Sequence, residues 1–330
     1  MKRILLLTFC LVLVLCLAMT VHAKTERLIF STMFPESYTY ILEPSIDFCK
    51  KVEERTGGEV KFDIYHSKQL FGGKQEFAAV GRGEIDLGIP HDIYHTGEVP
   101  ELGIVSLPFL FEDEDQAMYM LRAGLKEMIR PILEKANNCV LLGWVAFDPY
   151  NFYSKKPIRS IEDIKGKIWA VSGTTASKAI EAVGGSPTMM SSSELYLALQ
   201  TNTIDGCVRP LLTGVGRRLY EVSKYWTQIN LSPWGDILIL NKDRWDKLTP
   251  DVQKIMWQAG REWEDQAFLM AKEFTQTAIK KLKDGGMNIS KFPPEEIIKL
   301  RKAMEVVYKW WIEEEVPDGQ KYLDFVESHR

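Results

Sequence analysis

One arginine of this chain stands where a small anion could be bound. Arg209 comes at the end of the β-prone segment 203–208 and directly before Pro210. A guanidinium group is planar and can hold a carboxylate through two parallel hydrogen bonds, which a lysine cannot match. A structural salt bridge at the edge of a sheet is the alternative role. Arg209 is therefore the first candidate for contact with an anionic ligand.

Aromatic and polar side chains gather in the segment 147–153. Aromatic walls with a few polar groups are typical of small-molecule pockets, and Asp148 and Tyr150 are the candidates for ligand contact here. Trp169, in a later β-prone run, could stack on a planar ligand. Packing in the core or at a hinge is the alternative for these aromatic residues.

His91 and a pair of serines are further candidates. His91 follows the β-prone segment 84–89, as Arg209 follows its own strand. His91 and His95 have the i,i+4 spacing that can bind a metal on a helix, but no third ligand is evident and we expect no metal site. Ser191 and Ser192 stand at an S-x-x-E helix start, where they can cap the helix, contact a ligand, or both.

The sequence lacks the motifs of common hydrolases and nucleotide-binding enzymes. It contains no G-x-S-x-G, H-E-x-x-H or phosphate-loop pattern. The pair His91 and Asp92 is the simplest acid–base candidate, so a secreted enzyme stays open as an alternative. The pattern favours a protein that holds a small molecule without transforming it, and we expect no cofactor.

The elements that must position these residues are clearest from 164 to 210. A strand at 167–171, a turn at 172–175 that opens a helix, and the helix stop Gly184-Gly185 are followed by a strand, a helix and a further strand. A parallel α/β sheet of this kind places its loops at the carboxyl ends of the strands, where small ligands bind. The turn at 172–175 could also offer backbone N–H groups to an anion.

A weaker copy of this pattern lies upstream. The segments EFAAVGRGEIDLGIPH and ELYLALQTNTIDGCVRP both run from an acidic helix start through an apolar helix into an Ile-Asp strand. One ends at His91 and the other at Arg209. Two such units facing each other across a cleft predict an α/β, two-lobed fold of the periplasmic binding protein class (type II-like), which closes on its ligand by hinge motion.

The expected lobes are discontinuous in sequence. Lobe I comprises 24–146 plus 235–275, and lobe II comprises 147–234 plus 276–330. The strands expected at 223–228 and 237–240 would return the chain to lobe I. Thr249-Pro250 begins an apolar periodicity of about 34 residues, roughly 50 Å as a helix, which is long enough to span both lobes. Two helices with an unmarked break are the alternative.

Bulk composition limits the partners and the compartment. The chain has 330 residues, a formal net charge of −4 and no long basic run, which argues against nucleic acid as a partner. Residues 1–23 have a basic start, an apolar run of about 24 Å as a helix and a Val-His-Ala cleavage site, as in a signal peptide cleaved after Ala23. An uncleaved anchor is the alternative. Cys49, Cys139 and Cys207 then remain, either with one disulfide or as three free thiols.

Several blocks, in order along the chain, resemble the DctP-like substrate-binding proteins of TRAP-type (tripartite ATP-independent periplasmic) transporters. They are FCKKVEERTGGEVKFDIYHSKQLFGGKQEFAAVGRGEIDLG, LPFLFED, SKKPIRSIEDIKGKIWAVSG, SSSELYLALQTNTIDGC and NKDRWDKLTPDVQKIM. The resemblance implies two α/β domains, a long helix spanning both, and closure on a small organic anion. It also implies a periplasmic protein, expected as a monomer, that delivers its ligand to a small and a large membrane subunit.

The resemblance also marks departures at the expected ligand site. The arginine that usually follows the K-G block is replaced by Trp169, and a second common arginine falls on or near Tyr150. The family asparagine after the D-G strand is Arg209. The family often lines its site with the return segment, which here supplies Trp234 and Asp236.

Two ligand classes follow from these departures. An organic acid with an aromatic or bulky apolar part would have its carboxylate on Arg209 and its body against Trp169, Tyr150 and Trp234. An amine or zwitterion would instead face Asp148 or Asp236, with cation–π attraction from the aromatic residues. A binding protein coupled to sensing instead of transport also stays open.

Overall fold

The computed structural model describes residues 25–330. The signal-peptide prediction for residues 1–23 therefore lies outside the described residues. Within the part that is described, no helix combines the length and the apolar character needed to cross a bilayer.

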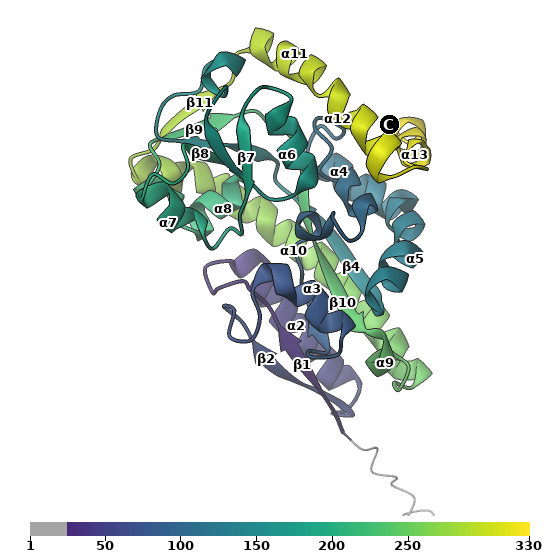
Figure 1. Ribbon diagram of the computed structural model, residues 1–330. Coiled ribbons are helices and arrows are strands. Elements are labelled where there is room, and N and C mark those ends of the chain that lie inside the picture. Colours follow the sequence, from purple (N-terminus) through teal and green to yellow (C-terminus); the bar gives the residue numbers. More distant parts are fainter. Residues whose placement is uncertain (1–24) are drawn as a thin grey trace, which may run out of the picture.

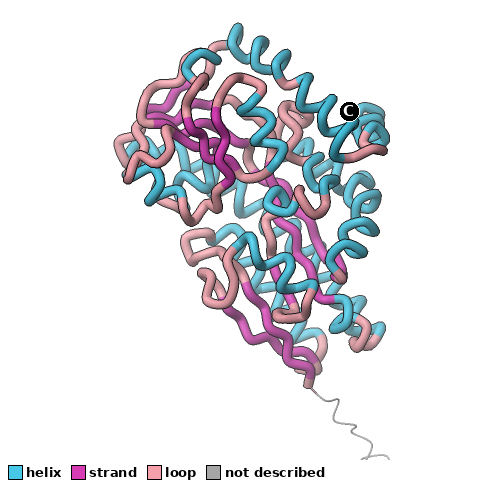
Figure 2. Tube along the Cα trace, in the orientation of Figure 1, coloured by secondary structure: helices cyan, strands magenta, loops and turns pink. Residues whose placement is uncertain are grey.

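The strands form two separate sheets, in different halves of the molecule (Figure 2). The first sheet has the order β2-β1-β3-β10-β4, with β1 (Glu26–Ser31), β2 (Val60–Tyr65), β3 (Leu87–Gly88), β4 (Cys139–Phe147) and β10 (Trp234–Asn241). The second has the order β11-β9-β5-β8-β6-β7, with β5 (Tyr150–Ser154), β6 (Ile168–Val171), β7 (Ser186–Met189), β8 (Gly206–Pro210), β9 (Tyr225–Gln228) and β11 (Asn288–Lys291). Each sheet is the centre of one lobe, so the predicted two-lobed α/β architecture is confirmed.

The first two passages of the chain between the lobes lie next to each other. It leaves lobe I after β4 and returns at the start of β10, where Trp234 pairs with Phe147 in antiparallel register. One sequence expectation is wrong here. The strand expected at 223–228 is β9, and it pairs with β5 and β11 in lobe II instead of returning to lobe I.

Helices cover both sheets (Figure 1). Their bounds are α2 (Thr39–Arg55), α3 (Gly73–Gly81), α4 (Glu114–Met120), α5 (Lys126–Asn137), α6 (Thr174–Glu181), α7 (Leu195–Gln200), α8 (Leu211–Gly216), α9 (Lys242–Trp245), α10 (Pro250–Asp284), α11 (Pro294–Ala303), α12 (Glu305–Trp310) and α13 (Gln320–Ser328). A 3-10 turn, η1 (Asp92–His95), follows β3.

The long helix α10 is continuous over 35 residues and lies across both lobes (Figure 1). Thr249 caps it, since its hydroxyl accepts a hydrogen bond from the Val252 N–H at 3.4 Å, and Pro250 takes the first helical position. The helix packs on α2 and β4 of lobe I and on α8 of lobe II. The prediction of one helix spanning both lobes is confirmed.

The C-terminal helices contact both lobes, whereas we expected all of 276–330 in lobe II. The Glu296 carboxylate accepts from the Ile161 N–H of lobe II at 2.9 Å. Farther on, Trp311 donates to the Pro100 carbonyl and the C-terminal Arg330 donates to a carbonyl of lobe I, at 3.3 and 2.8 Å. The tail therefore runs from lobe II back over lobe I, alongside α4 and α5 (Figure 1).

Candidate functional site

A small cavity lies where the two lobes meet. Its volume is about 10 Å³, which is room for about one water. Lobe I lines it with Met33, Phe34, Tyr38, His91, Tyr94 and Trp234, and lobe II lines it with Ser172, Ser192, Arg209, Pro210 and Thr213. Most of these residues follow strand ends, as expected for a ligand site in an α/β fold. Four predicted site residues therefore meet here: His91, Ser192, Arg209 and Trp234.

The lobes are in contact around this cavity. The Ser192 N–H donates to the Tyr94 hydroxyl at 2.8 Å, and Lys74 Nζ donates to the Met189 carbonyl at 3.3 Å. At Gly173 there is no room for a side chain, because an added Cβ would lie 2.2 Å from the Ile93 carbonyl oxygen of the other lobe. The molecule is therefore in a closed arrangement.

Arg209 is buried in the lobe II wall, and the exposed fraction of the whole residue is 1%. Its Nη1 donates to the carbonyls of Val208 and Ala170 at 2.7 and 3.2 Å, and its Nη2 donates to those of Val171 and Met190 at 3.1 and 2.8 Å. These bonds engage all four Nη hydrogens, and Nε has no acceptor among residues 25–330. The expected two-point grip on a carboxylate through the Nη pair is therefore not open to Arg209, which retains one N–H and its charge.

His91 is the neutral centre of the lobe I wall. Its Nδ1 lies 2.8 Å from the Gly235 carbonyl oxygen and 3.2 Å from Asp236 Oδ1. Its Nε2 lies 3.4 Å from the Tyr150 hydroxyl, which donates to Ser172 Oγ at 3.2 Å. Burial lowers the pKa of His91 to about 4, so the ring is uncharged at neutral pH. Tyr150 thus supports the site from behind instead of lining the cavity.

The two predicted counter-charges for an amine stand behind the cavity wall. Asp148 caps α8, because its Oδ2 accepts from the N–H groups of Leu211 and Leu212 at 2.6 and 3.3 Å, and Trp234 donates to its Oδ1 at 3.3 Å. Asp236 is fully buried and neither of its oxygens has a hydrogen-bond partner in the described chain. Burial raises the pKa of Asp148 to about 7 and that of Asp236 well above its usual value. Neither carboxyl group faces the cavity.

Trp169 is not at the cavity. Its indole N–H donates to the Ile164 carbonyl at 3.0 Å, its ring packs on Phe152 with centroids 4.8 Å apart, and it borders a separate hollow beside Lys155 and Asn202. The cavity lies at the carboxyl end of β6, at Ser172. Trp169 stands three residues earlier, about 10 Å back along the strand. Trp169 therefore packs in the core of lobe II, which was the alternative to ligand contact.

Sequence analysis missed Phe34, Tyr38, Tyr94 and Thr213. Phe34 and Tyr38 lie in the loop between β1 and α2, so the strand-end argument that selected His91 applied to this loop as well. Tyr94 lies in η1 and reaches the other lobe through its hydroxyl. Thr213 belongs to α8, a six-residue helix that the sequence pattern does not predict.

The remaining predicted features are structural. The Ser191 N–H donates to Glu194 Oε2 at 2.6 Å, which is one half of the expected capping box. His95 is bound to Glu98 Oε2 through Nδ1 at 2.9 Å. Within residues 25–330 no group of three or more His, Cys, Asp or Glu side chains could hold a metal ion. All three described cysteines are buried free thiols, at positions 49, 139 and 207.

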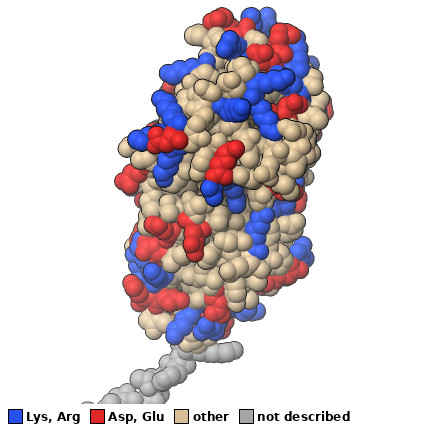
Figure 3. Space-filling view, turned by 90° about the vertical axis from the view of Figure 1, so that its left-hand side faces the viewer, with Lys and Arg blue, Asp and Glu red and all other residues tan. Residues whose placement is uncertain are grey.

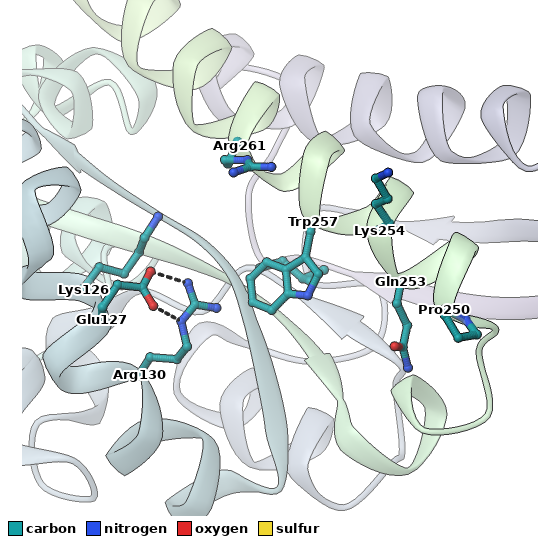
Figure 4. Close-up of a pocket in the computed structure, with 9 residues that line it drawn as sticks. Lys126, Glu127, Arg130, Pro250, Gln253, Lys254, Trp257 and Arg261 are labelled. Carbon is teal, nitrogen blue, oxygen red and sulfur yellow. Dashed lines mark hydrogen bonds and ion pairs between the residues drawn. The ribbon is translucent and has the colours of Figure 1, made fainter.

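A larger, open hollow lies on lobe I between α5 and the first half of α10 (Figure 4). The Arg130 side chain donates twice to Glu127 there and lies over the Trp257 ring, with its Cζ 4.4 Å from the ring centroid. Lys126 forms a buried ion pair with Glu264. These groups already have protein partners, and the hollow does not involve lobe II.

Comparison with known proteins gives a consistent family match. The family model described as bacterial extracellular solute-binding protein, family 7 (DctP), matches residues 30–315. The uncharacterised protein YiiZ of Salmonella typhimurium is 31% identical over 260 residues, covering 76% of this chain and 78% of that protein. The sialic acid-binding periplasmic protein SiaP of Vibrio cholerae is 29% identical over 265 residues, covering 78% of this chain and 80% of SiaP.

A solved structure has the same fold. The crystal structure of an extracytoplasmic solute receptor from Bordetella pertussis that binds pyroglutamic acid superposes with a TM-score of 0.87 and 22% identity. The match covers 92% of this chain and 100% of that chain. At this level of identity, the likeness concerns the fold alone.

Proposed function

We propose that this chain, which belongs to family 7 of the bacterial extracellular solute-binding proteins, captures a small organic acid outside the cytoplasm as the receptor of a TRAP transporter. The observation that carries the proposal is the charge of the cavity. Arg209 lines it, and none of the described residues that line it is acidic. A buried cation that faces a cavity without a counter-charge favours an anionic ligand.

The body of the ligand would be apolar or aromatic in part. Phe34, Tyr38, Tyr94 and Trp234 contribute ring surface to the cavity wall. In this closed arrangement the cavity has about 10 Å³ of room, enough for about one water, which is far below the roughly 300–1,000 Å³ of pockets that hold drug-sized ligands, so the wall must move to admit a ligand. We therefore expect a compact acid, with its carboxylate toward lobe II.

An amine or zwitterion is the weaker candidate. It would need an ionised carboxylate at the cavity, and Asp148 and Asp236 are buried behind the wall with raised pKa values. Trp234 could still contribute cation–π attraction, but Arg209 would repel a pure cation.

Catalysis has little support in the geometry. The candidate pair His91 and Asp92 is engaged within lobe I, because Asp92 Oδ1 accepts from the Ile93 N–H at 2.6 Å and Oδ2 accepts from the Trp144 indole at 3.0 Å. We propose a binding role without turnover. Conversion of a bound acid during prolonged incubation with purified protein would contradict this.

Export and partners complete the proposal. We propose cleavage after Ala23, a monomer in the periplasm, and delivery of the ligand to a small and a large membrane subunit. Positive and negative side chains are interspersed on the face shown in Figure 3, without the basic stripe that a nucleic-acid site needs. Intact-mass measurement of exported protein should show the loss of residues 1–23. Neighbouring genes for the two membrane subunits would distinguish transport from sensing.

The main test identifies the ligand. Mature protein would be purified, its bound molecules released by unfolding, and the released molecules identified by mass spectrometry. The refolded protein would then be screened by thermal shift against carboxylic acids and matched amines, since a ligand that binds only the folded state raises stability by about 2.7 kcal/mol at a hundredfold excess over Kd. Stabilisation by acids is expected. Stabilisation by amines alone would contradict the proposed ligand class.

A further inference from the structure

A second arginine, Arg217, follows the end of α8 and lies over Tyr38, one of the residues that line the cavity, although Arg217 does not itself line it. Its N–H donates to the Thr213 carbonyl at 2.9 Å, which continues the helical turn and places Arg217 on the same side as Thr213. Thr213 lines the cavity. The Arg217 Cζ lies 5.1 Å from the centroid of the Tyr38 ring, which lines the cavity from the other lobe. The guanidinium group is therefore held between the two lobes.

Two nitrogens of Arg217 are buried without an acceptor. Nε and Nη2 are shielded from solvent, and neither has a hydrogen-bond partner within residues 25–330. The Tyr38 hydroxyl also lacks a partner at good hydrogen-bond geometry, although Thr213 and Arg217 lie close enough to lower its pKa against the larger, raising effect of burial. Nearly all buried N–H groups in proteins have a partner, and those that lack one reduce stability. A ligand with hydrogen-bond acceptors could accept from all three groups, namely Nε and Nη2 of Arg217 and the hydroxyl of Tyr38.

The free edge of Arg217 is the edge that binds carboxylates elsewhere in this molecule. In Arg82, Nε and Nη2 each donate to a different oxygen of Glu84, both at 2.9 Å. In Arg130, the same two nitrogens donate to the two oxygens of Glu127, at 2.9 and 2.8 Å. An Arg217 edge with Nε and Nη2 both free therefore has the donor pattern for one carboxylate.

Arg209 and Arg217 differ in what they leave free. Arg209 has its four Nη hydrogens on backbone carbonyls, whereas Arg217 keeps an adjacent donor pair. We infer that Arg217 is the side chain that grips the ligand carboxylate at two points, while Arg209 supplies fixed charge and one N–H to another ligand oxygen. This inference rests on the proposed function as a receptor for an organic acid.

The test compares neighbouring arginines. Arg218 follows Arg217 in the chain but is exposed and forms an ion pair with Glu221, so Arg218→Ala is the matched control. Wild type, Arg217→Ala, Arg217→Lys and Arg218→Ala would be titrated calorimetrically with succinate, pyroglutamate and D-glucuronate, after removal of any co-purified molecule by unfolding and refolding. For the acid that wild type binds best, Arg217→Ala should weaken affinity about thirtyfold or more, and Arg218→Ala less than about twofold.

Two further measurements separate ligand contact from a structural role. Arg217→Lys keeps the charge but loses the paired donors, so it should recover only part of the affinity. Urea unfolding of ligand-free Arg217→Ala should match wild type, and added guanidinium ion should partly restore acid binding to this variant. An affinity for Arg217→Ala within about twofold of Arg218→Ala would overturn the inference while leaving the proposed function intact. Absence of binding of any carboxylate to wild type would overturn both.

Discussion

The two walls of the cavity differ in the charge of their buried ionisable groups. Lobe II contributes two guanidinium groups, that of Arg209 in the wall and that of Arg217 beside Tyr38. Lobe I contributes His91, whose pKa burial lowers to about 4, backed by Asp236, whose pKa burial raises well above its usual value. Lobe II therefore carries buried cations, whereas burial favours the uncharged forms of the lobe I groups, including Asp92, whose pKa it raises to about 7.

Backbone structure explains how lobe II keeps a buried cation. The carbonyls that receive the Arg209 hydrogen bonds belong to β6, to β8 and to Met190, just after β7, so the guanidinium links three adjacent strands near their ends. In lobe I, carboxyl groups such as Glu76, with a pKa raised to about 8, lose their charge instead. An entering anion thus meets attraction from one side and no carboxylate repulsion from the other. We therefore propose that lobe II recognises the charge of the ligand and that lobe I contributes to closure.

The largest expected effect on ligand affinity comes from blocking that closure. In Gly173→Ala the new Cβ would meet the Ile93 carbonyl oxygen at 2.2 Å, so the lobes could not reach their present contact. Gly173 has an extended backbone that any residue adopts, and the effect is therefore steric. Affinity for the acid should fall on the order of a hundredfold, because the closed state becomes a minor population.

The control for this variant is Gly97→Ala, since a Cβ at Gly97 would meet no atom within 4 Å. Small-angle scattering with saturating acid should show a larger radius of gyration for Gly173→Ala than for wild type or Gly97→Ala. Equal radii and equal affinities would mean that the lobes do not need this contact to hold ligand.

The next prediction compares how replacement of each lobe II arginine by alanine changes the free energy of unfolding. Arg209→Ala removes one donor from each of the carbonyls of Ala170, Val171 and Met190, of which Val171 keeps the Met190 N–H, and should lower the free energy of unfolding by about 2–4 kcal/mol. Within residues 25–330, Nε and Nη2 of Arg217 have no hydrogen-bond partner to lose, so Arg217→Ala should change the free energy of unfolding by less than about 1 kcal/mol. Urea unfolding of the ligand-free proteins measures both. Similar losses for the two variants would remove the distinction between a structural and a ligand-binding guanidinium.

Particular residues show how far sequence alone could define this site. Strand-end logic placed His91 and Arg209 at one cavity, and the apolar period from Thr249 onward gave α10 as a single helix. The strand at 225–228 was foreseen, but its sheet was not, because pairing with β5 and β11 depends on contacts far apart in sequence. Arg217 was missed for the same reason: its significance comes from Tyr38, which lies on the other lobe.

The neutrality of lobe I can be tested by pH. Because the pKa of Asp236 is raised in the folded protein, the folded state binds this proton more tightly than the unfolded chain. Its contribution to stability is therefore full below about pH 4 and is lost as the pH rises above that value. Asp236→Asn has no such proton, so its stability relative to wild type should increase from pH 5 to pH 8, by at most about 1.4 kcal/mol per unit.

Urea unfolding at several pH values provides the measurement for Asp236. Asp63→Asn is the control, because Asp63 lies at the surface on Arg27 and its pKa is lowered. The stabilisation provided by Asp63 is lost only as the pH falls below about 4. The difference in the free energy of unfolding between Asp63→Asn and wild type should therefore stay constant from pH 5 to pH 8. Parallel pH curves for wild type and Asp236→Asn would show that Asp236 is ionised in the folded protein, and lobe I would then carry a negative charge beside the cavity.

The smallest expected effect concerns the contribution of lobe I to closure. Tyr94→Phe removes the hydroxyl that accepts the Ser192 N–H at 2.8 Å, so this N–H would be left without that partner in the closed state. In the open state both groups can bind water, and the ligand-free protein should unfold at the same urea concentration as wild type. Acid affinity should fall about threefold to tenfold, which corresponds to roughly 0.5–1.5 kcal/mol for one hydrogen bond. Tyr119→Phe, at a position 57% exposed, is the matched control and should bind as wild type does. A loss in Tyr94→Phe as large as that in Arg217→Ala would mean that lobe I recognises the ligand itself, and the division of roles between the two walls would not hold.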